Sequence, residues 1–165
     1  MSLKIDTAQI DQAARNLDGV ALRTPLQKNL ALSDKYGAEI YLKREDLQIV
    51  RSYKIRGAYN KICSLDQSVL DKGVICASAG NHAQGFAYSC NLLGINGKVY
   101  IPTTTPRQKV EKVAFFGKDK VEVILSGDTY DDSCKSAKKA SIEEGLTFIH
   151  PFDDMDIIRG QATLG

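Results

Sequence analysis

Apolar and polar positions in the second half of the chain follow a strand period and a helix period in turn. Four short runs rich in β-branched residues recur at regular intervals, as buried parallel strands do. They span residues 74–78, 98–102, 121–125 and 147–150. The pattern therefore predicts four strands separated by connecting segments long enough to hold helices.

The segments between these runs carry apolar residues at helical spacing. The clearest is the segment from Asn81 to Gly94, where Gly94 is placed to end a helix. Pro106 can open the next helix, and Asp128 or Thr129 can cap a third. The apolar faces predicted for the three helices are Ala83, Phe86, Ala87, Cys90 and Leu93, then Val110, Val113 and Ala114, then Tyr130, Cys134, Ala137 and Ala140.

Strict alternation of strand and helix predicts an α/β fold, a parallel sheet with helices on both faces. In such sheets ligands bind beyond the carboxyl ends of the strands. Ser78 stands at such an end, after the first predicted strand.

The opening third of the chain has a different pattern. It predicts a helix with Ile10, Ala13, Ala14 and Leu17 on one face, an extended segment over 23–26, a helix ending near Gly37 and a strand over 40–43. We interpret this third as part of another structural layer.

Composition narrows the class of protein. The 165 residues suit one ordinary domain, and 43% hydrophobic residues, 25% charged residues and a formal net charge of +2 are typical of a soluble globular protein. The net positive charge is too small to indicate nucleic-acid binding. No apolar run approaches the roughly 20 residues of a membrane-spanning helix. Residues 1–6 lack the apolar stretch of a signal peptide, so we expect a cytoplasmic protein.

Cysteine and histidine give no metal-binding pattern. Cys63, Cys76, Cys90 and Cys134 form no C-x-x-C pair, and we expect them to be buried thiols. His82 and His150 stand apart from other ligands, so no structural metal site is expected.

Residues 52–58, Ser-Tyr-Lys-Ile-Arg-Gly-Ala, place a lysine where a helix is predicted to begin. Ser52 can cap that helix, and the positive helix end together with desolvation would lower the pKa of Lys54. Such an amine is a usable nucleophile that can form a Schiff base. The alternative is an exposed lysine on an amphipathic helix, which is the commoner case among 22 Lys and Arg residues.

Residues 78–85, Ser-Ala-Gly-Asn-His-Ala-Gln-Gly, form a turn of small residues between a strand and a helix. Its amides would point outward at a positive helix end and could bind a carboxylate or phosphate. The alternative is an ordinary strand-to-helix turn. The segment matches neither a P-loop nor a dinucleotide-binding fingerprint.

Four segments in order, 23–26, 41–48, 52–59 and 77–85, resemble the pyridoxal-phosphate enzymes of fold type II, and among them the threonine dehydratases. The resemblance continues through shorter matches at 101–102, 105–106, 108–110, 115–117, 127–130 and 150–153. It spans nearly the whole chain, and it is strongest to dehydratases of isoleucine biosynthesis.

The resemblance implies a role for each motif residue. Lys54 would form the Schiff base with pyridoxal 5′-phosphate and move protons at the substrate, and Tyr53 would pack near the cofactor. Asn81 would hydrogen-bond the 3′-oxygen of the cofactor. The loop implied to hold the substrate carboxylate consists of Ser78, Ala79, Gly80, Asn81 and His82.

The implied reaction is dehydration and deamination of L-threonine to 2-oxobutanoate and ammonia. Serine is the alternative substrate, through a serine dehydratase or racemase relative. Racemases of the group carry a second serine where this chain has Ala79, so dehydration is favoured, although Ala79 could also reflect tight packing at the turn.

The resemblance also divides the chain. Residues 1–69 would belong to a large cofactor domain, 70–150 would form a small domain, and 151–165 would return to the large domain. Because the family's catalytic region is about twice as long, we expect this chain to be inactive alone, or to act as a non-catalytic fragment or assembly partner. Apolar faces at Ile10, Leu17, Leu26 and Leu42 would then be exposed unless they pair with another chain or repack, which predicts a homo-oligomer or aggregation.

Overall fold

The computed structural model describes residues 6–165. Residues 1–5, on which the prediction about a signal peptide mainly rests, lie outside the described residues. The strands are β1 (Leu26–Lys28), β2 (Tyr41–Lys43), β3 (Val74–Ala77), β4 (Gly97–Ile101), β5 (Val121–Leu125) and β6 (Thr147–Phe148). The α-helices are α1 (Thr7–Asn16), α2 (Leu30–Tyr36), α3 (Lys54–Cys63), α4 (Gln67–Leu70), α5 (Asn81–Leu93), α6 (Arg107–Gly117), α7 (Tyr130–Glu144) and α8 (Met155–Ala162). Two short 3₁₀ helices complete the set, η1 (Glu45–Leu47) and η2 (Lys118–Lys120).

The four predicted strands form one parallel sheet in the order β5-β4-β3-β6. β3 pairs with β4 through Val74 opposite Gly97, and with β6 through Val74 opposite Thr147. The predicted parallel sheet is therefore confirmed, with β6 two residues shorter than expected. Because β3 and β6 are parallel neighbours, the segments that follow them emerge at the same edge.

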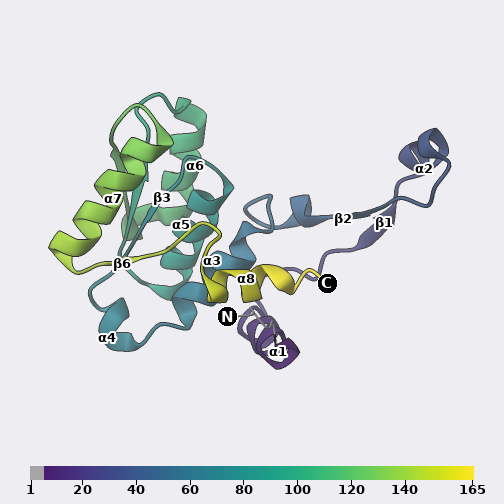
Figure 1. Ribbon diagram of the computed structural model, residues 1–165, viewed down its shortest axis with the longest axis horizontal. Helices are drawn as coiled ribbons and strands as arrows, with labels where there is room; N and C mark the ends of the chain where they lie inside the picture. Colours follow the sequence, from purple (N-terminus) through teal and green to yellow (C-terminus); the bar gives the residue numbers. More distant parts are fainter. Residues whose placement is uncertain (1–5) are drawn as a thin grey trace.

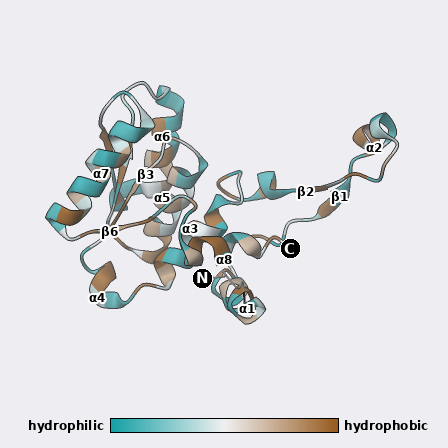
Figure 2. Cartoon of the chain, in the orientation of Figure 1, coloured by the Kyte–Doolittle hydropathy of each residue, from teal (hydrophilic) through white to brown (hydrophobic). Residues whose placement is uncertain are grey.

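Helices cover both faces of this sheet, as predicted (Figure 1). Alternate side chains of β3 point to opposite faces. Val74 and Cys76 join the larger apolar cluster, which includes Phe86 of α5 and Val113 of α6. Ile75 and Ala77 face the other way, in a smaller cluster with Ala137 and Ala140 of α7. Figure 2 shows this hydrophobic interior between more hydrophilic outer helix faces.

The helix boundaries largely follow the predicted caps. Gly94 ends α5 in the left-handed conformation at φ 72°, and Thr129 opens α7 with a capping box to Asp132. The prediction of a buried position was wrong for two residues. Ala114 and Tyr130 are exposed, because the faces that contact the sheet are centred on Val113 in α6 and on Ser133 and Ala137 in α7.

Helix α8 crosses α3 at backbone contact distance (Figure 1). A Cβ added to Gly160 would lie 2.5 Å from the carbonyl oxygen of Arg56, so only glycine allows this approach. At the other end of the contact, Lys61 pairs with Asp154 and Asp156, each at 3.0 Å. The contact fixes the helix that begins at Lys54 against the end of the chain.

A buried ionic network joins the segments around α3. Arg56 Nη2 donates to Glu45 Oε1 at 2.8 Å, and Arg56 Nε donates to Glu45 Oε2 at the same distance. Thr24 Oγ1 and Gln48 Nε2 donate to the same carboxylate at 2.5 and 3.1 Å, and Arg56 Nη2 also donates to the carbonyl of Leu22. The network ties the opening third of the chain to α3.

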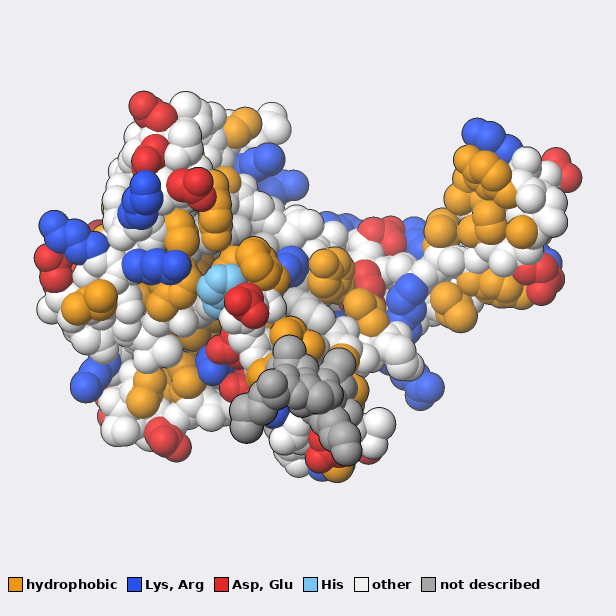
Figure 3. Space-filling view, viewed as in Figure 1, with side chains coloured by type: hydrophobic (Ala, Val, Ile, Leu, Met, Phe, Trp, Pro, Cys, Tyr) orange, Lys and Arg blue, Asp and Glu red, His pale blue; other side chains and the backbone are white. Residues whose placement is uncertain are grey.

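Residues 26–43 form an arm that extends away from the sheet, with β1 and β2 antiparallel and α2 at the tip (Figure 1). Hydrophobic side chains gather on this arm in Figure 3. Leu26 is 64% exposed and Leu42 is also exposed, as predicted. Ile10 is half-buried and Leu17 only 3% exposed, so Leu17 packs inward after α1, which is the repacking alternative.

The cysteines only partly match the expectation of buried thiols. Cys76 and Cys90 are buried, and burial raises the pKa of both thiols, whereas Cys63 and Cys134 are half-buried. All four are free thiols. Within residues 6–165 no helix is long and apolar enough to cross a membrane.

Candidate active site

Lys54 is the first residue of α3, one residue later than the predicted start of the helix. Tyr53 occupies the cap position and provides no side-chain cap, so the prediction that Ser52 caps the helix was wrong in position. The Ser52 hydroxyl nevertheless accepts a hydrogen bond from the backbone amide of Lys54 at 3.2 Å. Arg51 turns the chain into the helix at φ 58°, in the left-handed region that non-glycine residues seldom adopt.

The Lys54 side chain is half-buried beside the connection from β6 to α8. Its Nζ donates to the carbonyl oxygen of Pro151 at 2.8 Å and lies 5.6 Å from the centre of the Tyr53 ring. Desolvation lowers the pKa of Lys54 below its ordinary value. A larger share of this amine is therefore neutral, and nucleophilic, at a given pH.

Residues 78–82 turn from β3 into α5 at the carboxyl edge of the sheet. Ser78 Oγ accepts the amide of Gly80 at 3.2 Å, and no side chain caps the first turn of α5. The first amides of a helix have no carbonyl of a preceding turn to bond. A Cβ at Gly80 would meet nothing within 4 Å, so the turn faces open space where an anion can approach these amides.

Gly85 brings the two motifs together. A Cβ at Gly85 would lie 3.1 Å from the carbonyl carbon of Lys54 and from the amide nitrogen of Ile55. The start of α3 therefore packs directly on the second turn of α5. Residues 54 and 78–82, separate in sequence, share one edge of the sheet.

His82 is buried behind this turn. Its Nε2 lies 3.3 Å from the carbonyl oxygen of Ile149, so this nitrogen carries the proton, and Nδ1 has no partner among residues 6–165. Burial, with a smaller contribution from the charge on Lys54, lowers the pKa of His82 to about 4. The imidazole is thus neutral at pH 7, and in this tautomer Nδ1 can only accept a hydrogen bond.

The remaining predicted residues lie around the same edge. Asn81 and Tyr53 are exposed, with their polar ends free to meet a ligand. Ala79 is partly buried against the larger apolar cluster, which supports a packing role for its methyl group. The structure therefore places every predicted site residue along one edge.

Sequence reasoning missed the contributions of Pro151 and Gly85. Pro151 belonged to a matched segment but had no assigned role, and it supplies the acceptor for Lys54. A main-chain acceptor leaves no mark in residue type, so the sequence held no signal for it. Gly85 did carry a signal, because a glycine inside a helix often marks close approach of another backbone.

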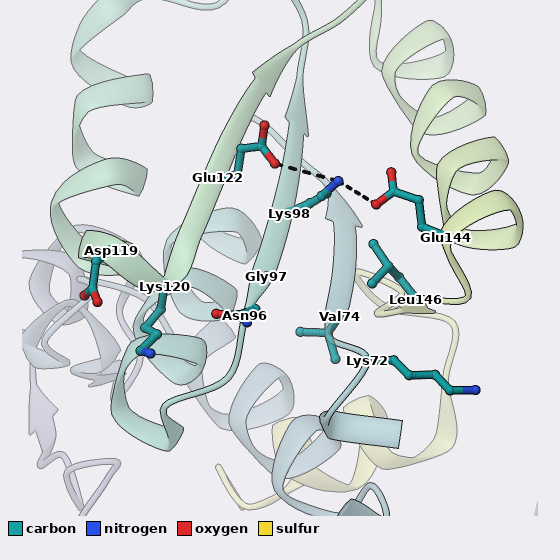
Figure 4. Close-up of a pocket in the computed structure, with 10 residues that line it drawn as sticks. All are labelled: Lys72, Val74, Asn96, Gly97, Lys98, Asp119, Lys120, Glu122, Glu144 and Leu146. Atoms are coloured by element: carbon teal, nitrogen blue, oxygen red, sulfur yellow. Dashed lines mark hydrogen bonds and ion pairs between the residues drawn. The ribbon is translucent and has the colours of Figure 1, made fainter. Parts of the chain in front are cut away.

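A cavity of about 300 Å³ lies at the opposite edge, at the amino ends of the strands (Figure 4). Lys98 pairs there with Glu144 at 2.6 Å and with Glu122 at 3.7 Å. Over the whole lining, three lysines stand against three carboxylates, so the formal charges of the cavity cancel. Because α/β sheets bind ligands at the carboxyl edge, this cavity is not the candidate active site.

Comparison with solved structures supports the fold. Threonine deaminase isoform 2 from Solanum lycopersicum matches 97% of this chain and 45% of its own, at 42% identity and a TM-score of 0.86. Maize serine racemase matches 96% of this chain and 47% of its own, at 32% identity and a TM-score of 0.90.

Sequence comparison gives the same family. A biosynthetic L-threonine dehydratase from Halalkalibacterium halodurans is 57% identical over 98% of this chain, and one from Bacillus subtilis is 55% identical over 97%. The chain spans only 39% and 38% of those two relatives. The family model described as pyridoxal-phosphate dependent enzyme matches residues 17–165. The chain therefore belongs to the pyridoxal-phosphate-dependent enzyme family.

Proposed function

We propose that this chain carries the Schiff-base lysine and the substrate-carboxylate loop of an L-threonine dehydratase. The observation that carries the proposal is the packing of Lys54 against the helix whose first turn presents uncapped amides. The high identity to biosynthetic L-threonine dehydratases supports this substrate. The products would be 2-oxobutanoate and ammonia, in isoleucine biosynthesis.

The residues present suit pyridoxal phosphate. A half-buried amine with a lowered pKa lies beside an open turn with free amides, and Tyr53 and Asn81 are exposed near it. Lys54 would hold the cofactor covalently, while Asn81 and Tyr53 would contact it. When bound, the cofactor supplies an aldehyde for amines and a ring that withdraws electrons from the substrate Cα.

The chain's own groups then have defined tasks. Lys54 acts first as a nucleophile, because desolvation favours its neutral form, and later carries protons at the substrate. The amides in the first turn of α5 hold the substrate carboxylate. His82 contributes to that grip only through its main chain, since its neutral imidazole has no N–H left to donate.

Ala79 favours dehydration over racemisation. The chain is also similar to maize serine racemase, and racemisation needs a group that can protonate the second face of the substrate Cα. The methyl group of Ala79 cannot do so and packs against the apolar cluster instead. A serine-directed racemase is therefore the less favoured function.

Reductive labelling tests the role of Lys54. The protein is mixed with pyridoxal phosphate, reduced with borohydride and digested for mass spectrometry. Because Lys54 is a lysine with a pKa lowered by desolvation, we expect it to be labelled at least tenfold more than the exposed Lys139. Equal labelling of the two lysines would contradict the proposal.

Turnover is measured separately, by adding threonine and assaying 2-oxobutanoate. The same assay with serine separates the two substrates. Little turnover by these 165 residues alone remains a prediction, and clear turnover would show it to be wrong.

We also propose that residues 1–69 and 151–165 belong to a domain distinct from residues 70–150, and that the chain self-associates. The arm supports self-association, since β1, β2 and α2 make few contacts with the rest of residues 6–165 and expose Leu26 and Leu30, the latter 75% accessible. Apolar surface of this kind favours contact with another chain.

Light scattering tests self-association. We expect a mass above that of a monomer, and the double substitution Leu26→Lys with Leu30→Lys should shift the protein toward monomer, because it places charge on the arm. Ile142→Lys is the matched control, since Ile142 is 82% exposed on α7, far along the chain from the arm. A wild-type protein that is monomeric throughout would refute self-association.

A further inference from the structure

The connection from β6 to α8, residues 149–154, is held by side chains from both helices of the candidate site. We call this segment the strap. His82 of α5 binds the carbonyl of Ile149 at 3.3 Å, and Lys54 of α3 binds the carbonyl of Pro151 at 2.8 Å. Lys61 of α3 pairs with Asp154 at 3.0 Å.

The middle of the strap depends on Lys54 more than its ends do. Ile149 is buried and its amide donates to the carbonyl of Ile75 at 2.8 Å, which anchors the strap to the sheet. The amides of Phe152 and Asp153 instead donate to Nδ1 of His150, at 3.3 and 2.7 Å. Those two bonds close a turn within the strap itself. The turn is attached to α3 by the Lys54 bond, in addition to the packing of the buried Pro151.

We propose that the Lys54 ammonium latches the strap, and that the strap is released when the Lys54 nitrogen reacts as a nucleophile. The inference rests on the proposed function, in which Lys54 takes an aldehyde. The ammonium first loses one proton to solvent. The two hydrogens left on nitrogen then leave with the aldehyde oxygen as water, while a carbon–nitrogen double bond replaces the carbon–oxygen one.

After that step the nitrogen no longer holds the hydrogens that it donates to Pro151. The state of Lys54 and the position of the turn at 150–153 are therefore linked, and such linkage is reciprocal. Anything that weakens the latch favours reaction of Lys54, and reaction of Lys54 loosens the strap. His82 and Lys61 do not take part in the step, so the two ends stay attached.

Amide hydrogen exchange on the 165-residue chain tests the latch without any cofactor. Lys54→Met keeps the length of the side chain and removes the donor. We expect the amides of Phe152 and Asp153 to exchange at least fivefold faster, the change that the loss of one part-buried hydrogen bond produces. Amides of β4 should not change, and Lys139→Met, a lysine of α7 paired with Glu143, should leave the strap as in wild type.

A second measurement adds the cofactor. Pyridoxal phosphate should speed exchange at Phe152 and Asp153 as Lys54→Met does, whereas pyridoxine phosphate, which lacks the aldehyde, should not. Unchanged strap exchange in Lys54→Met overturns the latch. If Lys54 is labelled by pyridoxal phosphate but strap exchange stays equal or slows, the release is refuted although the proposed function stands. If Lys54→Met loosens the strap but Lys54 resists labelling, the proposed function fails and only the latch survives.

Discussion

Replacing Glu45 by Gln is expected to lower the free energy of unfolding by about 3 to 5 kcal/mol. Glu45 and Arg56 are only 8% and 6% exposed, and their two-pronged contact is buried among neutral groups. The amide leaves the Arg56 charge without a counter-ion in a place that little water reaches. An uncompensated buried charge costs far more than a lost surface pair.

Urea unfolding of the variant measures this loss. Asp46→Ala is the matched control, since Asp46 lies in the same turn and forms an exposed pair with Arg44. It should change stability little. The double substitution Glu45→Leu with Arg56→Met should recover much of the loss, because removing both charges removes the penalty. A Glu45→Gln protein as stable as the control would show that the network does not hold the opening third to α3.

The network also predicts acid sensitivity. Burial by itself would raise the pKa of Glu45, but the hydrogen bonds from Arg56 and Thr24 outweigh it and hold the pKa below its ordinary value. A carboxyl group with a lowered native pKa stabilises the fold above its unfolded pKa. That contribution disappears as the pH falls below about 4.

His82 is expected to make the protein lose about 2 kcal/mol of stability between pH 7 and pH 4.5. Burial lowers the pKa of His82 to about 4 in the native state, whereas an unfolded histidine titrates near 6.5. Between those values the unfolded chain binds a proton that the native state does not. Stability from this group is therefore complete above pH 6.5 and falls as the pH drops toward 4.

Comparison with His82→Gln isolates this effect. Glutamine can donate to the carbonyl of Ile149 as Nε2 of histidine does, but it does not titrate. Urea unfolding at pH 7 and at pH 4.5 should show a much smaller loss in the variant, with His150 present in both proteins. Parallel losses would mean that His82 is protonated in the native state at pH 4.5.

Local patterns in the sequence predicted the sheet and most helix ends. The four β-branched runs correspond to β3, β4, β5 and β6. Gly94 ends α5 and Thr129 begins α7, as their capping preferences predicted. The errors were also local. Ala114 and Tyr130 have the right spacing for a buried face, but the angle at which each helix lies on the sheet decides which residues within the stripe are covered.

The candidate residues of the site were likewise named from the sequence. Lys54 and the turn at 78–82 carry distinctive residue types, and the resemblance to fold type II enzymes gave each a role. They meet because the start of α3 packs on α5 at Gly85. Pro151 lies at the same edge because the segments after the parallel neighbours β3 and β6 emerge together.

What the sequence alone determined is therefore the α/β framework, and it named two candidates for the site: Lys54 as a nucleophile and the turn at 78–82 as an anion-binding turn. Tertiary structure alone decided how that amine is held, by the carbonyl of Pro151, and that His82 is neutral with Nδ1 unpartnered. The physical reason is that a main-chain carbonyl is the same in every residue. Its position, and the burial that shifts a pKa, depend on contacts between residues nearly a hundred positions apart.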